Sequence, residues 1–193
     1  MKTRSKNLTR PWLAAAVAAL SLAALPALAQ KVRLATSAGD IMVQLDAEKA
    51  PKSAANFLQY VRSGHYNDTL FHRVIQEFMI QGGGYKADLS QKPTRKAIPL
   101  ESDNGLSNAR GTVAMARTGD PDSATAQFFI NVVDNAFLDK ANARDGNGYA
   151  VFARVIEGMD VVDKIRAVPT QESGQHPNLP VTPVTIRKAT VEN

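Results

Sequence analysis

The sequence contains no cysteine among its 193 residues. This absence excludes disulfide bonds, thiol nucleophiles and cysteine-ligated metal sites. Histidine is scarce as well: the three residues, at positions 65, 72 and 176, lack the His-x-x-x-His spacing of a helical zinc site. We therefore expect the hydrophobic core alone to stabilise the chain, and we expect neither a metal nor a cofactor.

Two common catalytic motifs are also absent. No Gly-x-Ser-x-Gly occurs, which argues against a serine hydrolase with a nucleophile elbow. The triplet Gly82-Gly83-Gly84 is not followed by the Gly-Lys-Ser/Thr that a phosphate-binding loop needs. We interpret these glycines as a tight backbone exit from a strand.

The excess of positive charge lies at the N-terminus. The chain has 23 Lys and Arg against 18 Asp and Glu, a net charge of +5. The first 29 residues contain four of the basic residues and none of the acidic ones, an apolar run over residues 12–25 and a small-x-small site at residues 27–29. This pattern predicts a cleaved secretory signal peptide at 1–29 and export to the periplasm, with an uncleaved anchor as the alternative. Residues 30–193 then carry a net charge of +1, which gives no sign of nucleic-acid binding. Once the leader is cleaved, we expect no stable membrane association.

Arg73 occupies an unusual position for a charged residue. Two short apolar runs within residues 70–85 flank a polar pair and are typical of strands. Alternation predicts Phe71, Arg73 and Ile75 on one face, with His72 on the other in a satisfied structural role. Because a guanidinium is costly to bury without partners, an arginine on an apolar wall suggests a groove for a neutral ligand with exposed dipoles, such as a peptide. The alternative is an edge-strand arginine whose head lies in water.

The hydrophobic pattern of residues 30–193 predicts a single, mainly β domain. Alternating strands are expected at 32–36, 41–45, 111–116, 127–133, 149–155 and 181–191, besides the two around Arg73. Helices are expected from Pro51 to about Ser63 and from Met159 to Val168, and a loop over 86–108. Seven or eight strands with two separate helices favour an antiparallel barrel or sandwich with helices covering its ends.

Two sequence segments resemble the cyclophilins, a family of proline isomerases. The family pattern Phe-His-Arg-x-Ile-x-x-Phe-Met-x-Gln-Gly-Gly is met at residues 71–83, and Gln-Phe-Phe-Ile at residues 127–130. The resemblance covers the chain after residue 30 and implies a closed eight-stranded antiparallel barrel capped by two α-helices, with the active groove on its outer surface. It also implies peptidyl-prolyl cis-trans isomerase activity on exported proteins, assisting their folding.

The resemblance further implies roles for individual residues. Arg73 would donate toward the proline nitrogen or the turning carbonyl, and Gln81 would orient the peptide or the arginine. The implied substrate-binding positions are Phe78, Met79, Ala116, Arg117, Gln127, Phe129, Phe137, Leu138 and Tyr149. Phe137, Tyr149 and Arg117 replace the tryptophan, histidine and asparagine of the best-known drug-binding members, so we expect weak cyclosporin binding. Phe137 and Tyr149 also resemble the exported bacterial branch.

The expected partners are proline-containing peptides and unfolded exported proteins, bound by a monomer. Two other functions stay open at this point. The chain could be a non-catalytic proline-peptide binding module or periplasmic holdase chaperone, which would keep the pocket and dispense with the arginine. It could also be a barrel used purely for assembly with a partner, which would have an ordinary surface in place of the groove.

Overall fold

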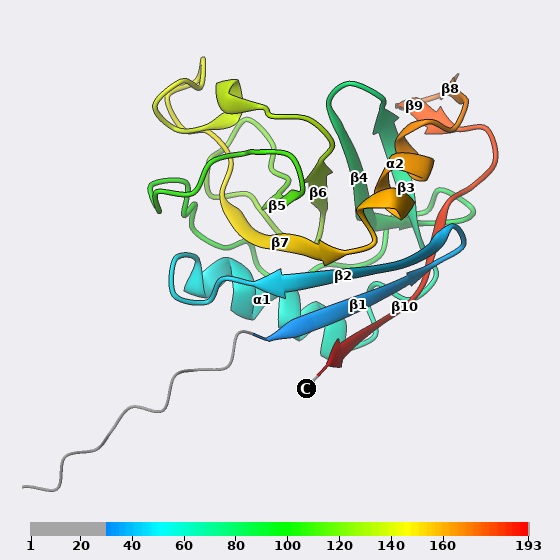
Figure 1. The fold of residues 1–193 in the computed structure, drawn as a ribbon, viewed down its shortest axis with the longest axis horizontal. Coiled ribbons are helices and arrows are strands. Elements are labelled where there is room, and N and C mark those ends of the chain that lie inside the picture. Colours follow the sequence, from blue (N-terminus) through cyan, green and yellow to red (C-terminus); the bar gives the residue numbers. More distant parts are fainter. Residues whose placement is uncertain (1–29, 193) are drawn as a thin grey trace, which may run out of the picture.

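The computed structural model describes residues 30–192, in which eight antiparallel strands close into a barrel (Figure 1). The predicted signal peptide at 1–29 lies outside the described residues. The barrel order is β1-β10-β3-β4-β6-β5-β7-β2. The strands are β1 (Lys31–Thr36), β2 (Gly39–Leu45), β3 (Thr69–Ile75), β4 (Met79–Lys86), β5 (Thr112–Met115), β6 (Phe128–Asn131), β7 (Val151–Glu157) and β10 (Thr185–Glu192). The closed barrel confirms the mainly β prediction and rules out the sandwich.

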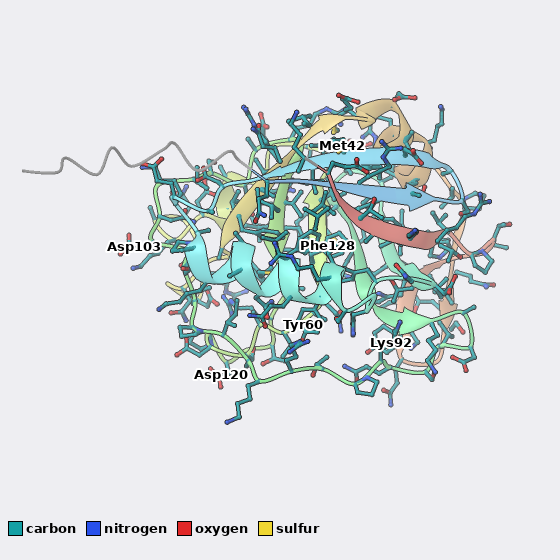
Figure 2. The ribbon with its side chains drawn as sticks, turned by 90° about the horizontal axis from the view of Figure 1, so that it is seen from below. Met42, Tyr60, Lys92, Asp103, Asp120 and Phe128 are labelled. Carbon is teal, nitrogen blue, oxygen red and sulfur yellow. The ribbon has the colours of Figure 1, made fainter. Side chains whose placement is uncertain are left out.

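Two α-helices pack on different sets of strands. Helix α1 (Pro51–Arg62) begins with proline at its first turn, where the missing N–H costs nothing, and lies against β7 and β10. In Figure 2, α1 crosses in front of the barrel strands. Helix α2 (Met159–Arg166) follows Gly158, whose φ of 87° suits glycine, and packs on β2, β3 and β4. Both helices fall where the sequence predicts them.

Large apolar side chains fill the barrel interior. The ring of Phe57 on α1 lies 5.0 Å from Tyr66, 5.4 Å from Phe128 and 5.2 Å from Phe152, measured between ring centroids. All four side chains are fully buried. Aromatic packing of this kind gives the barrel a rigid centre without any disulfide.

A bulge in β3 breaks the alternation that the sequence suggests. Phe71 pairs with Gly82, whereas Arg73 pairs with Gln81, so two steps along β3 match one step along β4. Phe71 consequently packs in the barrel core, while Arg73 lies outside it. The prediction that Phe71 shares a face with Arg73 is therefore wrong, since it assumed a strand without a bulge. Ile75 does lie beside the arginine's apolar surroundings, as predicted.

His72 is buried on the outer side of β3, where Arg73 and Gln127 are among its neighbours, so the prediction that it faces away from Arg73 is wrong for the same reason. Its ring lies 4.6 Å from the ring of Tyr85 and 6.2 Å from that of His176. Among the described residues its Nδ1 has no hydrogen-bond partner, so the expectation of a satisfied side chain is wrong, and its structural role stays a prediction. Burial, and next the neighbouring His176, lower the pKa of His72 to about 4.

The glycine triplet lies inside β4 and does not end it. A Cβ at Gly82 would come within 2.9 Å of the Leu70 carbonyl oxygen, and one at Gly83 within 2.8 Å of the Tyr66 ring. The interpretation as a strand exit is wrong, because glycine is needed here for close packing of neighbouring chain segments.

A small hairpin and a short helix were not predicted. Strands β8 (Thr170–Ser173) and β9 (His176–Pro180) form a separate sheet, and β9 packs against β3. The 3-10 helix η1 (Ala136–Leu138) follows β6. Within residues 30–192, no helix is long and apolar enough to cross a membrane, and no group of three potential metal ligands occurs.

Candidate active site

A second apolar cluster lies on the outside of the barrel, separate from its core. Along β4, β5 and β6 the side chains alternate: Ile80, Val113 and Phe128 enter the barrel core, and their neighbours point outward. We call this outward group the outer cluster. Its buried members are Met79, Ala114, Phe129, Leu138 and Val151, and its partly buried members are Ile75, Phe78, Leu106, Ala116 and Tyr149.

Aromatic side chains form the rim of the outer cluster. The rings of Phe78 and Phe137 are stacked 5.6 Å apart, and Phe137 on η1 is 56% exposed. On the other side, Tyr149 meets Phe129 edge-on at 5.6 Å. Partly and fully exposed aromatic rings around buried apolar side chains suit a small apolar ligand group, such as a pyrrolidine ring.

Arg73 lies at the edge of this cluster. Its guanidinium carbon is 6.0 Å from the centre of the Phe78 ring, and its Nη1 donates a hydrogen bond to Gln81 Oε1 at 3.3 Å. Burial lowers the pKa of the arginine, and Tyr149 opposes that shift. The group still remains charged, because arginine does not lose its proton in proteins. Within residues 30–192 this is its one hydrogen bond, so most of its five N–H donors are available to a ligand.

A row of polar side chains continues from Arg73. Gln81 donates through Nε2 to Gln127 Oε1 at 2.9 Å. Gln127 lies directly over Gly84, where a Cβ would come within 2.7 Å of the Gln127 side chain. The absence of a side chain at position 84 therefore allows Gln127 to approach Gln81. The structure thus places Arg73, Gln81 and Gln127 together, as the family pattern implies.

Arg117 is committed to contacts within the protein. Its Nε donates to the Gly148 carbonyl at 2.9 Å, its guanidinium carbon lies 4.5 Å from the centre of the Tyr149 ring, and it pairs with Asp145. Its side chain is 2% exposed. The hydrogen bond from Arg117 is the main reason that the pKa of Asp145 falls to about 2. Direct contact of this guanidinium with substrate stays a prediction, whereas Ala116 lies in the cluster wall.

The structure brings most of the implied substrate-binding residues together and adds others. Leu138 is buried in the outer cluster, next to Met79 and Phe129. Sequence reasoning missed Leu106 because it falls in the predicted loop, where no periodicity marks a buried residue. Asp145 was also missed, since only the fold brings it to Arg117.

The fold and this site define a barrel of the cyclophilin type, and comparison with known proteins gives the same result. Residues 31–191 match the family model "Cyclophilin type peptidyl-prolyl cis-trans isomerase/CLD". The chain belongs to this family, whose members are enzymes.

Curated relatives match over nearly their whole length. The Streptomyces antibioticus peptidyl-prolyl cis-trans isomerase cyp18 is 58% identical over 161 residues, covering 83% of this chain and 97% of the relative. The Dickeya dadantii peptidyl-prolyl cis-trans isomerase A is 54% identical over 184 residues, with 93% and 96% covered. The Escherichia coli peptidyl-prolyl cis-trans isomerase B is 55% identical over 157 residues, with 81% and 96% covered. These relatives support isomerase activity in this chain.

Solved structures show the same fold. A Cryptosporidium parvum cyclophilin type isomerase superposes with a TM-score of 0.71 at 26% identity, covering 86% of this chain and 98% of that one. A second structure of that protein, in the presence of the dipeptide Ala-Pro, gives a TM-score of 0.70 at 26% identity and covers 85% and 99%.

Proposed function

We propose that this enzyme accelerates the cis–trans isomerisation of X–Pro bonds in exported polypeptides, assisting their folding in the periplasm. One observation carries the proposal: a half-buried guanidinium, with a single hydrogen bond among the residues that the structure describes, stands at the edge of an apolar cluster on the barrel's outer surface. The Ala-Pro dipeptide present with the Cryptosporidium parvum relative supports proline peptides as the ligand class.

The reaction requires rotation about an amide bond and breaks no bond. Its barrier is about 18–20 kcal/mol, because the twisted amide loses its resonance. A catalyst must therefore bind the twisted state more strongly than the planar one. As the amide twists, the nitrogen lone pair is no longer shared with the carbonyl and becomes localised on nitrogen. A fixed charged donor such as Arg73 can stabilise this lone pair.

The outer cluster supplies the second requirement, which is a firm hold on the proline ring. Met79, Phe129 and Leu138 form its buried floor, and Phe78 and Phe137 form its aromatic rim. A ring seated there keeps one side of the amide fixed while the other side rotates. Gln81 would orient Arg73, and Gln127 would hold Gln81 through the 2.9 Å bond between them.

Export rests on the sequence features of residues 1–29. We propose cleavage after Ala29, so that the mature enzyme begins at Gln30 and acts in the periplasm. N-terminal sequencing of the protein recovered from the periplasmic fraction of cells expressing the full chain tests this. A full-length protein in the cytoplasmic or membrane fraction would contradict it.

The catalytic role of Arg73 is tested by Arg73→Ala. The full chain is expressed and the product assayed with an X–Pro peptide. We expect kcat/KM to fall by about 100-fold or more, because the transition-state donor is lost. The unfolding midpoint should change little, since the side chain lies outside the core. Arg187→Ala, at an exposed position on β10, is the matched control and should retain full activity.

Exchange spectroscopy on a bound peptide distinguishes the enzyme from the holdase alternative. Faster cis–trans exchange of the wild-type complex supports the proposal. Binding without faster exchange would favour the holdase, and unchanged turnover in Arg73→Ala would refute the role of the arginine.

A further inference from the structure

Three buried asparagines lie beneath the outer cluster. Asn108 and Asn131 are 0% exposed and Asn135 is 2% exposed. Asparagine is rarely buried to this degree, because each amide must find partners for two N–H donors and a carbonyl. We call Asn108, Asn131 and Asn135 the amide chain, since each is hydrogen-bonded to the next.

One end of the amide chain is anchored by a carboxylate. Asp139 Oδ1 accepts the backbone N–H of Asn108 at 2.6 Å and the Asn108 Nδ2 at 2.9 Å. Its Oδ2 accepts the hydroxyl of Ser107 at 2.6 Å. The second N–H of Asn108 Nδ2 donates to the Tyr149 carbonyl at 3.3 Å. The Asn108 amide therefore connects the segment before β5 to Asp139, which follows η1, and to Tyr149.

The remaining two amides carry the connection to Phe78. Asn131 Nδ2 donates to Asn108 Oδ1 at 3.3 Å and to Thr112 Oγ1 at 2.9 Å. Asn135 Nδ2 donates to Asn131 Oδ1 at 2.8 Å and to the Phe78 carbonyl at 2.8 Å. Each of the three Nδ2 groups thus has two acceptors. Rotating any one side-chain amide by 180° would exchange its Nδ2 and Oδ1 and place an oxygen against two acceptors. The hydrogen bonds therefore fix the orientation of all three amides.

The far ends of these bonds are the segments that form the outer cluster. Phe78 lies in the turn between β3 and β4, and Tyr149 in the loop before β7. Phe137 and Leu138 lie between Asn135 and Asp139, and the Leu138 N–H donates to the Asn135 carbonyl at 2.8 Å. These segments are distant in the sequence and irregular in backbone, and among the described residues only a few backbone hydrogen bonds join them. The Tyr149 N–H donates to the Leu138 carbonyl at 2.9 Å, and the Val132 N–H donates to the Phe78 carbonyl at 3.2 Å. The asparagine side chains add to this sparse set of contacts. None of the three asparagines belongs to the outer cluster itself.

We infer that the amide chain positions the binding walls, by which we mean the segments that contain Phe78, Leu138 and Tyr149. Its three asparagines then control substrate affinity without touching the substrate. The inference rests on the outer cluster being the substrate pocket, as proposed above. Every Nδ2 donor of the amide chain has its acceptors. Buried donors satisfied in this way hold one geometry, and losing one member leaves others without partners. The binding walls should then separate slightly while Arg73 remains in place.

The test is Asn135→Asp, which preserves size and removes both donated bonds. The control is Asn142→Asp in the same loop, where the side chain is exposed and, among the residues that the structure describes, bonds only the Ala136 carbonyl. Steady-state kinetics with an X–Pro peptide are measured at 10 °C, after near-UV circular dichroism has confirmed that each variant is folded. We expect KM to rise about tenfold in Asn135→Asp with kcat within about twofold, because seating of the ring contributes to ground and transition states alike. The control should match the wild type.

Asp139→Asn provides a milder second variant, because this side chain lies at the partly exposed end of the amide chain. A smaller rise in KM, about threefold, is expected there. A folded Asn135→Asp or Asp139→Asn enzyme with unchanged KM would overturn the inference, even if its thermal midpoint had fallen. A lower kcat at unchanged KM would overturn it as well.

The wild-type enzyme separates this inference from the proposed function. Peptide titration followed by NMR should shift the ring signals of Phe78, Phe137 and Tyr149. If the wild type binds the peptide elsewhere, the proposed pocket fails. If it binds there and the variants bind equally well, only the positioning role fails.

Discussion

At the scale of single residues, the same side-chain type has different roles according to its partners. Within the described part of the chain, Arg73 has one hydrogen bond, to a neutral amide, and its guanidinium borders an apolar surface. Arg117, by contrast, has a carboxylate, two carbonyls and an aromatic face as partners. A guanidinium with few partners is free to bind a ligand, whereas one with a full set of partners fixes the structure around it.

Arg117→Ala is expected to weaken substrate binding through Tyr149. Removing the guanidinium takes away the cation that lies 4.5 Å from the Tyr149 ring and the bond to Gly148. The loop containing Asp145 should loosen, and KM should rise several-fold while kcat changes little, which steady-state kinetics can measure. Arg154→Ala is the control, because that arginine is exposed and its side chain bonds only Gln44 within residues 30–192. Equal kinetics in the two variants would show that Arg117 has no such role.

At the scale of elements, β3 and β4 create the site through two departures from a regular strand pair. The bulge in β3 directs Arg73 out of the barrel while Phe71 remains inside. The glycines of β4 allow side chains from neighbouring segments to approach its backbone. A regular β3 without the bulge would direct Arg73 differently, and larger residues in place of the β4 glycines would displace the side chains that now approach this strand.

Gly84→Ala is expected to impair catalysis more than folding. Its backbone does not have the positive φ of Gly83, so the change tests space rather than strain. The new Cβ would displace the flexible Gln127 side chain and break its bond to Gln81, and kcat/KM should fall several-fold. Stability should change by about 1 kcal/mol or less, because only a side-chain end has to move.

The matched control for this variant is Gly119→Ala. Apart from its neighbours in the chain, no atom of the described residues lies within 4 Å of the point that a Cβ at position 119 would occupy, so activity should be retained. Peptide isomerisation assays and urea unfolding on both variants give the comparison. A fully active Gly84→Ala enzyme would show that the position of Gln127 is unimportant.

At the scale of the whole molecule, stability comes from an aromatic core and buried polar groups without disulfides. Among the buried polar groups are His65, which is hydrogen-bonded to the Gly83 carbonyl, and His72, which packs on Tyr85. Burial is the main cause that lowers the pKa of each ring. Folding therefore keeps both histidines neutral at a pH where the unfolded chain binds protons.

This difference predicts a loss of stability in acid. The pKa of His72 is about 4 in the folded protein against 6.5 in the unfolded chain. Between these values the unfolded chain binds the additional proton, so stability falls as pH falls from 6.5 towards 4, by roughly 3 kcal/mol at most. Urea unfolding at several pH values measures this slope.

His72→Phe should flatten the slope while retaining an aromatic ring against Tyr85. The remaining slope would include the contribution of His65, whose lowered pKa acts in the same direction. Identical slopes in the wild type and the variant would show that His72 does not titrate in this window.

The sequence alone determined most of the elements and the family, because hydrophobic periodicity and an ordered motif are local properties; the β8–β9 hairpin and η1 were the exceptions. The two helices, the first hairpin and the barrel strands could be predicted from them, as could the grouping of Arg73 with Gln81 and Phe129. Only the tertiary structure decided the bulge in β3, the packing around the β4 glycines, the pairing of Arg117 with Asp145 and the amide chain. These features depend on contacts between residues distant in the sequence, and no local pattern records which distant segments the closed barrel brings together.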